Sequence, residues 1–98
     1  MTIFRRAARR DANEKELVTA ARAVGIRLWQ LDTPCDWLAL INGMWWPVEI
    51  KLPQGPRGGK SHSDLTPDQK QFVADAENAG GQVLIWRTVD DVLASVGK

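Results

Sequence analysis

The spacing of hydrophobic and polar residues predicts three helices and four strands in a single small domain. Leu17, Ala21 and Val24 recur at helical intervals, and Asp11 and Gly25 are residue types that favour the start and the end of this first helix. In chain order, the predicted elements cover residues 11–24, 26–31, 36–41, 45–52, 66–80, 82–86 and 88–96. The order α-β-β-β-α-β-α indicates an α/β fold built around a small mixed sheet.

Two later helices begin at capping sequences. Thr66-Pro-Asp-Gln69 combines a threonine N-cap, a proline in the first turn and a glutamine that can complete a capping box. Thr88 begins the last helix. We expect Phe72, Val73 and Ala76 of the preceding helix to face inward.

The second and third strands form a predicted hairpin that brings two carboxylates together. Asn42-Gly43 favours a two-residue type I′ turn, which pairs Ile41 with Met44. The same register places Asp36 directly opposite Glu49, on one face and with Cβ atoms roughly 5 Å apart. Like charges at that distance repel, and a divalent cation between them would provide a reason for the arrangement. Lys51, two residues beyond Glu49, projects from the same face.

Pro47 is an irregularity inside the third strand, because proline cannot donate a hydrogen bond to a neighbouring strand. It indicates either an edge position or a β-bulge. A bulge would shift the register and make Asp36 and Glu49 neighbours rather than strictly opposed residues.

Composition and charge exclude several classes of protein. The 98 residues suffice for one domain, and the net charge of +1 excludes a polycation. One cysteine and one histidine exclude an internal disulfide and a Cys/His zinc site. No long apolar run is present, so we expect a cytoplasmic protein that does not enter a membrane.

Basic residues concentrate in two segments. Residues 1–10 form a predicted basic arm, which is either a solvated terminus or a contact for phosphates, and residues 11–98 form the domain. A second basic segment, residues 53–64, has no hydrophobic periodicity and is predicted to be a loop. The candidate DNA contacts in these segments are Arg5, Arg6, Arg9, Arg10, Arg57 and Lys60.

An aspartate followed by Glu49-Ile50-Lys51 on the next strand resembles the PD-(D/E)xK nuclease superfamily. More narrowly, the chain is similar to the short stand-alone VRR-NUC proteins of phages and prophages. This resemblance rests on residues 11–18, the 48–51 strand, residues 65–69 and residues 89–94. The first helix and the hairpin also resemble archaeal Holliday-junction resolvases. The resemblance implies a restriction-endonuclease-like core.

By this resemblance, Asp36, Glu49 and the carbonyl of Ile50 would ligate Mg²⁺ or Mn²⁺. The ion would lower the pKa of the attacking water, and Lys51 would orient that water and stabilise charge on the phosphate. Gln69 matches a glutamine near the active site of these nucleases, although the capping box alone would explain it.

The first helix offers two further carboxylates, Glu14 and Glu16, which point to different sides. Glu14 lies near the apolar stripe, so we expect the helix to aim it towards the hairpin, with Glu16 as the second choice. Both also have a purely structural interpretation: Glu14 can be a helix-capping residue and Glu16 a solvated one.

Five tryptophans are many for this length. We expect Trp29, Trp37, Trp46 and Trp86 to be core or interface anchors. Trp45 and Trp46 point to opposite faces, so one of them is expected to be exposed for a dimer contact, which we favour, or for stacking on a base.

Three functions follow as hypotheses. The first is a metal-dependent DNA endonuclease, a homodimer that acts on branched DNA such as four-way junctions. The second is a catalytically silent nuclease-fold module that binds DNA or a protein partner. The third is a protein-interaction domain unrelated to nucleic acid.

Overall fold

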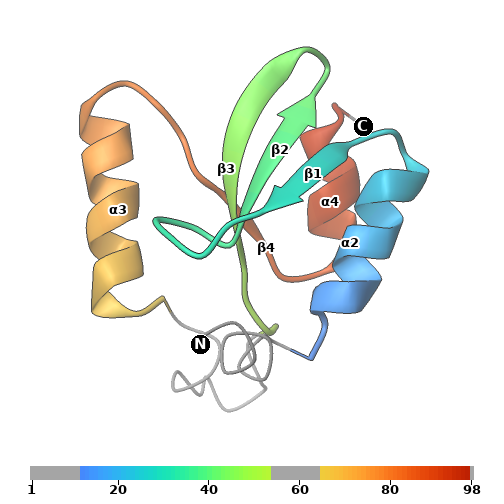
Figure 1. Cartoon of the computed structure of the whole chain (residues 1–98), viewed down its shortest axis with the longest axis horizontal. Coiled ribbons are helices and arrows are strands. Elements are labelled where there is room, and N and C mark those ends of the chain that lie inside the picture. The colour runs from blue at the N-terminus through green and yellow to red at the C-terminus, as the bar shows by residue number, and fades with distance from the viewer. Residues whose placement is uncertain (1–11, 54–64, 98) are drawn as a thin grey trace.

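The computed structural model describes residues 12–53 and 65–97 of the chain. Its helices and strands follow one another in the predicted order (Figure 1). They are α2 (Glu14–Ala23), β1 (Arg27–Gln30), β2 (Trp37–Ile41), β3 (Met44–Ile50), α3 (Pro67–Asn78), β4 (Leu84–Trp86) and α4 (Val89–Ser95). The predicted α/β class is confirmed. In the described part of the chain, no helix has the length and apolar character to cross a membrane.

The sheet has four strands in the order β1-β2-β3-β4 and is mixed, as predicted. β1, β2 and β3 form an antiparallel meander, because two short connections join them. β4 pairs with β3 in parallel, which requires a long crossover, and α3 lies in that crossover.

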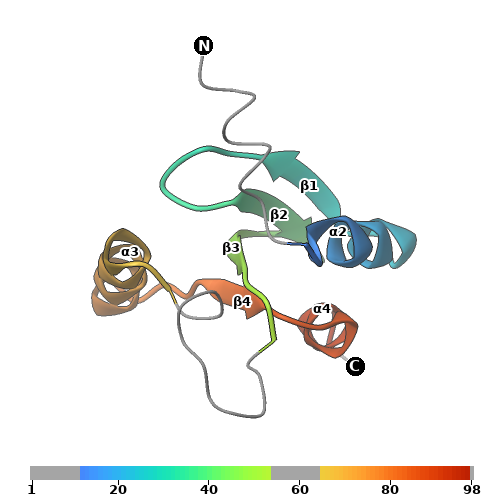
Figure 2. The same ribbon diagram turned by 90° about the horizontal axis from the view of Figure 1, so that it is seen from below.

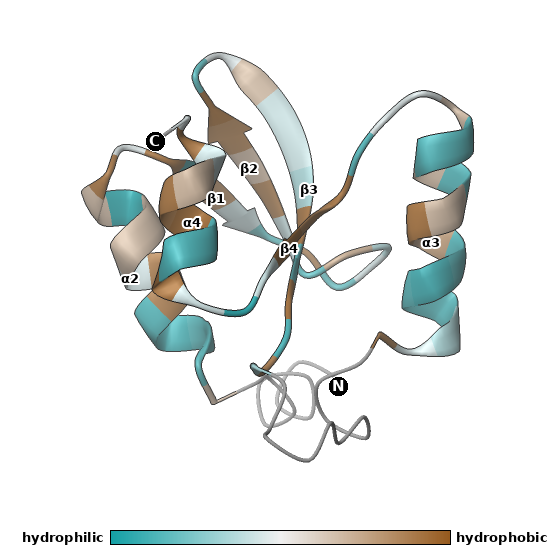
Figure 3. Ribbon diagram, turned by 180° about the vertical axis from the view of Figure 1, so that it is seen from behind, coloured by the Kyte–Doolittle hydropathy of each residue, from teal (hydrophilic) through white to brown (hydrophobic). Residues whose placement is uncertain are grey.

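Helices α2 and α4 cover one face of the sheet and pack against each other (Figure 2). This core face is apolar, and the hydrophobic colouring in Figure 3 follows β2 and β4 and parts of α2 and α4. Burial of these side chains is the main source of stability in such a domain. The buried strand residues are Leu28, Trp37, Ala39, Ile41, Val48, Ile50 and Trp86, and Leu17, Val18, Ala21 and Val92 of the helices meet them.

The predicted start of α2 at Asp11 is wrong. The helix begins at Glu14 with Asn13 at its N-cap, and Asn13 makes no side-chain capping hydrogen bond. The reason is tertiary, because the Asn13 amide is engaged elsewhere. Its Nδ2 donates to the carbonyls of Lys51 at 3.0 Å and Arg87 at 2.9 Å. Asp11 itself lies outside the described residues.

Helix α3 stands on the other side of the sheet from α2 and α4 (Figures 1 and 2). Phe72, Val73 and Ala76, which were expected to face inward, are partly covered, but no residue of α3 is fully buried. A pocket of about 560 Å³, lined by Ala76 and by residues 44–47 of β3, separates the end of this helix from the sheet. The C-terminal part of α3, at Ala76, therefore borders this pocket instead of packing directly on the sheet.

We call the second face of the sheet the outer face. Successive side chains of a strand point to opposite faces, so the outer face carries the strand residues that alternate with those of the core face. Two of its tryptophans bear on the expectations. Trp29 is 44% exposed, so of its two expected roles the core anchor is wrong and the interface anchor stays a prediction. Trp45, at 57%, is the exposed member of the Trp45-Trp46 pair, so the expected exposure of one of them is confirmed. The outer face carries Arg27, Trp29, Leu38, Leu40, Trp45, Pro47, Glu49 and Ile85.

Candidate active site on the hairpin

The hairpin has the predicted register. Asn42 and Gly43 adopt positive φ angles of 52° and 82°, as a type I′ turn requires, and Ile41 pairs with Met44. The ladder continues through Pro47, which lies opposite Leu38, so the bulge alternative is wrong. β4 begins to pair with β3 only at Val48. The edge alternative is therefore correct, since at Pro47 strand β3 pairs with β2 on one side and with no strand of the described chain on the other.

Asp36 continues this register directly before β2 and reaches the end of β3. Its Oδ2 accepts a hydrogen bond from the Ile50 backbone N–H at 2.9 Å, and its carbonyl accepts one from Leu31 N–H, also at 2.9 Å. Lys51 N–H donates to Trp86 on the β4 side. Because successive strand residues direct their backbone groups to alternate sides, the carbonyl of Ile50 points to the side of Asp36.

Glu49 lies within the sheet between β2 and β4 and has 0% exposure. Burial, and secondly the charge of Asp36, raise its pKa to about 8, while Lys51 opposes the shift. Its Oε1 accepts a hydrogen bond from Gln69 Nε2 at 3.2 Å. Its Oε2 is buried and makes no hydrogen bond of ordinary geometry within the described residues, although the side chain and backbone of Asp36 lie close enough to the Glu49 carboxyl to influence its pKa. A buried oxygen of this kind is destabilising unless a proton or a cation satisfies it.

Gln69 joins the two ends of the Glu-x-Lys sequence. Its Oε1 accepts hydrogen bonds from Lys51 Nζ at 3.3 Å and from Thr66 N–H at 2.9 Å, while its amide nitrogen holds Glu49. The Gln69 N–H completes the capping box by donating to Thr66 Oγ1 at 3.2 Å. Both interpretations of Gln69 therefore hold geometrically, because one side chain caps α3 and bridges Glu49 to Lys51.

Glu14 points towards the hairpin, as expected, but not to the two carboxylates. It is 8% exposed and accepts a hydrogen bond at 2.8 Å from the indole N–H of Trp37, which lies on the core face, whereas Glu49 lies on the outer face. Glu16 is exposed. Within residues 12–53 and 65–97, no three Asp, Glu, His or Cys side chains are grouped as metal ligands.

Asn13 was missed by sequence reasoning. Its two hydrogen bonds fasten the start of α2 to the ends of β3 and β4, and its Oδ1 is buried with no hydrogen-bond partner in the described chain. Arg87 strengthens the same junction through a 2.8 Å bond from Nη1 to the Leu52 carbonyl. These contacts hold the backbone from which the Lys51 side chain departs. The signal in the sequence was that Asn13 directly precedes Glu14, the helix carboxylate expected to point towards the hairpin.

Cys35 is buried beside the site, and its Sγ lies 3.4 Å from the Trp37 carbonyl. Burial raises the pKa of this thiol, and the charges of Glu49 and Asp36 raise it further. The thiol form is therefore favoured, which makes Cys35 a poor metal ligand.

The candidate DNA contacts Arg5, Arg6, Arg9, Arg10, Arg57 and Lys60 lie outside the described residues. Comparisons with protein-family models, with curated proteins and with solved structures found no match to this chain.

Proposed function

We propose that the protein is a metal-dependent DNA endonuclease of the PD-(D/E)xK type with a restriction-endonuclease-like core. One observation carries this proposal: Glu49 is fully buried beside Asp36, with one oxygen that makes no hydrogen bond of ordinary geometry within the described residues. The element order and the mixed sheet also support it.

The donors at this site fit Mg²⁺ or Mn²⁺. Asp36 and Glu49 are hard oxygen ligands, and the carbonyl of Ile50 points to the same side. Mg²⁺ commonly uses only one or two protein carboxylates and retains several waters, so the lack of a third carboxylate is compatible with it. When bound, such an ion supplies positive charge at the phosphate and a water of lowered pKa.

The chain's own residues would hold and orient the reacting groups. The Lys51 ammonium, tethered to Gln69 at 3.3 Å, would stabilise negative charge on the phosphate. Gln69 fixes Glu49 through Oε1 and leaves Oε2 for the ion. Preorganisation of this kind lowers the free energy needed to order the groups during reaction.

Cleavage assays test the proposal on linear, flap and four-way-junction DNA, with Mg²⁺, Mn²⁺ or EDTA. Wild type is expected to cut with metal only, and Asp36→Asn and Lys51→Ala are expected to lose at least about a hundredfold in rate. The matched controls are Asp90→Asn and Lys15→Ala, at exposed positions on α4 and α2. If the site variants cut as well as wild type, the proposal fails.

A chain that binds metal and DNA without cutting would instead be a nuclease-fold binding module. The absence of a grouped third carboxylate in the described residues is the observation that keeps this second function open. Calorimetric titration with Mn²⁺, run beside the cleavage assay, separates the two functions. Light scattering on the same samples tests whether the chain is a homodimer.

A further inference from the structure

The outer face presents three rows of side chains, because the strand registers place residues of β1, β2 and β3 side by side. The last row contains the candidate active site, and the other two lead away from it along the strands. From the far end, the rows are Arg27-Leu40-Trp45 and then Trp29-Leu38-Pro47. The same register, continued one step beyond the Trp37–Val48 pair, gives Asp36-Glu49 as the third row. The face is therefore continuous with the carboxylates.

Trp29 and Trp45 form an aromatic platform on this face. The two side chains belong to strands separated by β2, and their ring centroids lie 5.4 Å apart at an interplanar angle of 44°. The indoles therefore lean towards each other over Leu38 and Leu40, yet they remain 44% and 57% exposed. Large aromatic rings kept partly in water are suited to stacking on the bases of unpaired nucleic acid.

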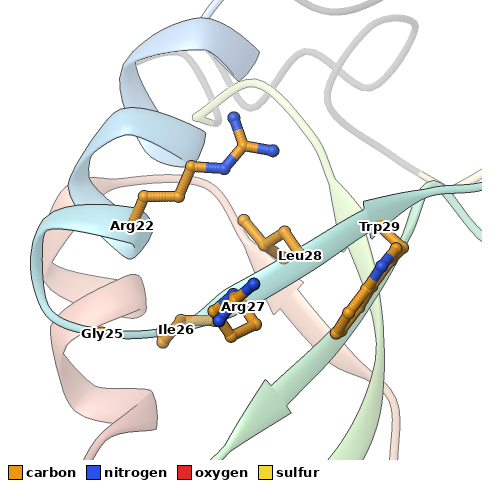
Figure 4. A pocket seen from close by; sticks show the side chains of 6 residues that line it. All are labelled: Arg22, Gly25, Ile26, Arg27, Leu28 and Trp29. Carbon is orange, nitrogen blue, oxygen red and sulfur yellow. The ribbon is translucent and has the colours of Figure 1, made fainter.

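Positive charge borders the platform. Arg22 and Arg27 are exposed and line a pocket of about 380 Å³ along the edge of β1, together with Trp29 (Figure 4). Within the described residues, no hydrogen bond or ion pair holds the Arg27 guanidinium group. Arg22 instead lies 5.8 Å over the ring of Trp37, on the core face, so Arg27 is the arginine that borders the platform. An exposed arginine such as Arg27 beside exposed indoles matches the phosphates and bases of one strand.

We propose that the outer face binds an unpaired stretch of DNA, with bases stacked on Trp29 and Trp45 and a phosphate held by Arg27. The assignment of this strand as substrate rests on the proposed nuclease function. Glu49 lies four positions beyond Trp45, about 13 Å along the strand.

A second copy of the chain is the competing occupant. Protein interfaces are depleted of charge at their centres. The platform, in contrast, lies between Arg27 on one side and Asp36 and Glu49 on the other. Because charged residues flank the platform, a polyanion that leads to a cation-binding site is a better occupant than an apolar protein surface is.

The experiment measures binding in EDTA, where the proposed reaction cannot proceed, by fluorescence anisotropy of a labelled single strand, a forked duplex and a blunt duplex. Leucine at Trp29 or Trp45 keeps an apolar side chain and removes the ring, while Trp45→Phe keeps an aromatic ring. Val24→Ala removes an exposed apolar side chain away from the platform and is the control. Circular dichroism melting checks that every variant folds.

We expect the single strand and the fork to bind more tightly than the blunt duplex. Trp29→Leu and Trp45→Leu are expected to weaken that binding about tenfold, whereas Trp45→Phe and Val24→Ala leave it within about twofold. Arg27→Gln is expected to lower the slope of log affinity against log salt by about 1.

Folded leucine variants that bind the single strand as wild type does would overturn the inference. So would a dimer, seen by light scattering, that Trp45→Asp dissociates while DNA binding stays unchanged, because the face would then belong to a second copy. A wild type that binds in this pattern but never cuts contradicts the proposed nuclease function and leaves the strand-binding face standing.

Discussion

Replacing Glu49 by glutamine is expected to stabilise the metal-free protein at neutral pH. Glutamine has nearly the same shape and still offers an oxygen to Gln69 Nε2, which donates to Glu49 Oε1 at 3.2 Å. It cannot ionise, so the substitution removes the free energy needed to keep a carboxyl protonated in the fold and preserves the packing.

The magnitude follows from the pKa of Glu49, which is raised from 4.5 to about 8, firstly by burial and secondly by Asp36. Below pH 4.5 this carboxyl is protonated in the folded and unfolded chains, and its contribution to stability is fully present. Between pH 4.5 and 8 the unfolded chain releases the proton while the folded chain retains it, so stability falls as pH rises. The loss is about 1.4 kcal/mol per pH unit, and about 3 kcal/mol by pH 7.

The assay is urea unfolding of wild type and Glu49→Gln in EDTA, at intervals from pH 5 to pH 8. The free energy of unfolding of the variant, minus that of wild type, is expected to grow by about 1.4 kcal/mol per pH unit. Glu16→Gln, on the exposed side of α2, is the control for loss of one carboxylate elsewhere. Parallel pH profiles for Glu49→Gln and wild type would refute the reasoning.

Adding Mn²⁺ at pH 7.5 extends the test to the metal. A ligand at a hundred times its Kd stabilises the folded state by about 2.7 kcal/mol, so wild type is expected to gain stability. Glu49→Gln, which has lost one proposed ligand, is expected to gain little. The pH result does not depend on the nuclease proposal, whereas the Mn²⁺ result does.

Three further changes test other contacts. Asn13→Ala leaves the carbonyls of Lys51 and Arg87 without their amide donor and is expected to lower the free energy of unfolding, measured in urea, by about 1–3 kcal/mol. An unchanged value would contradict the role of Asn13 in joining α2 to the ends of β3 and β4. Gly43→Ala places a side chain at a backbone φ of 82° and is expected to lower the free energy of unfolding, measured by thermal melting, by about 1 kcal/mol. A free energy of unfolding equal to that of wild type would contradict the type I′ turn. Glu14→Gln weakens the buried acceptor of the Trp37 indole N–H and is expected to lower the free energy of unfolding in urea more than Glu16→Gln, at an exposed position, does. Equal values for the two variants would contradict a structural role for that contact.

The hairpin could be predicted from the sequence because its geometry is local. Asn42-Gly43 specifies the turn, the turn fixes the register, and the register alone brings Asp36 to the level of Glu49. The capping box at Thr66 was predictable for the same reason, since its partners lie within four residues. The sequence could not decide whether Pro47 lies at an edge position or in a bulge, because that depends on the residue of β3 at which β4 begins to pair.

Features that depend on distant packing were not predictable in this way. The apolar spacing of α3 indicates a helix face but does not specify the pocket that separates it from the sheet. The start of α2 was placed too early because Asn13 binds two strand ends that are 38 and 74 residues away in the chain. Tryptophan is a residue type that cores often contain, but Trp29 is exposed because it lies on the outer face of β1, whereas Leu28 of the same strand lies on the core face and is buried.

The two faces of the sheet place opposite demands on β3. Val48 and Ile50 point into the apolar core, whereas Glu49 between them is equally buried and bears a carboxyl whose ionisation opposes folding at neutral pH. An apolar residue or glutamine at this position would give a more stable domain, so stability does not explain the glutamate. If a cation is the explanation, Glu49→Gln must change two properties in opposite directions, raising the metal-free stability while abolishing metal-dependent cleavage. A variant that was more stable and still cut DNA would separate the buried carboxyl from the chemistry, and a variant that lost both would make Glu49 a structural residue.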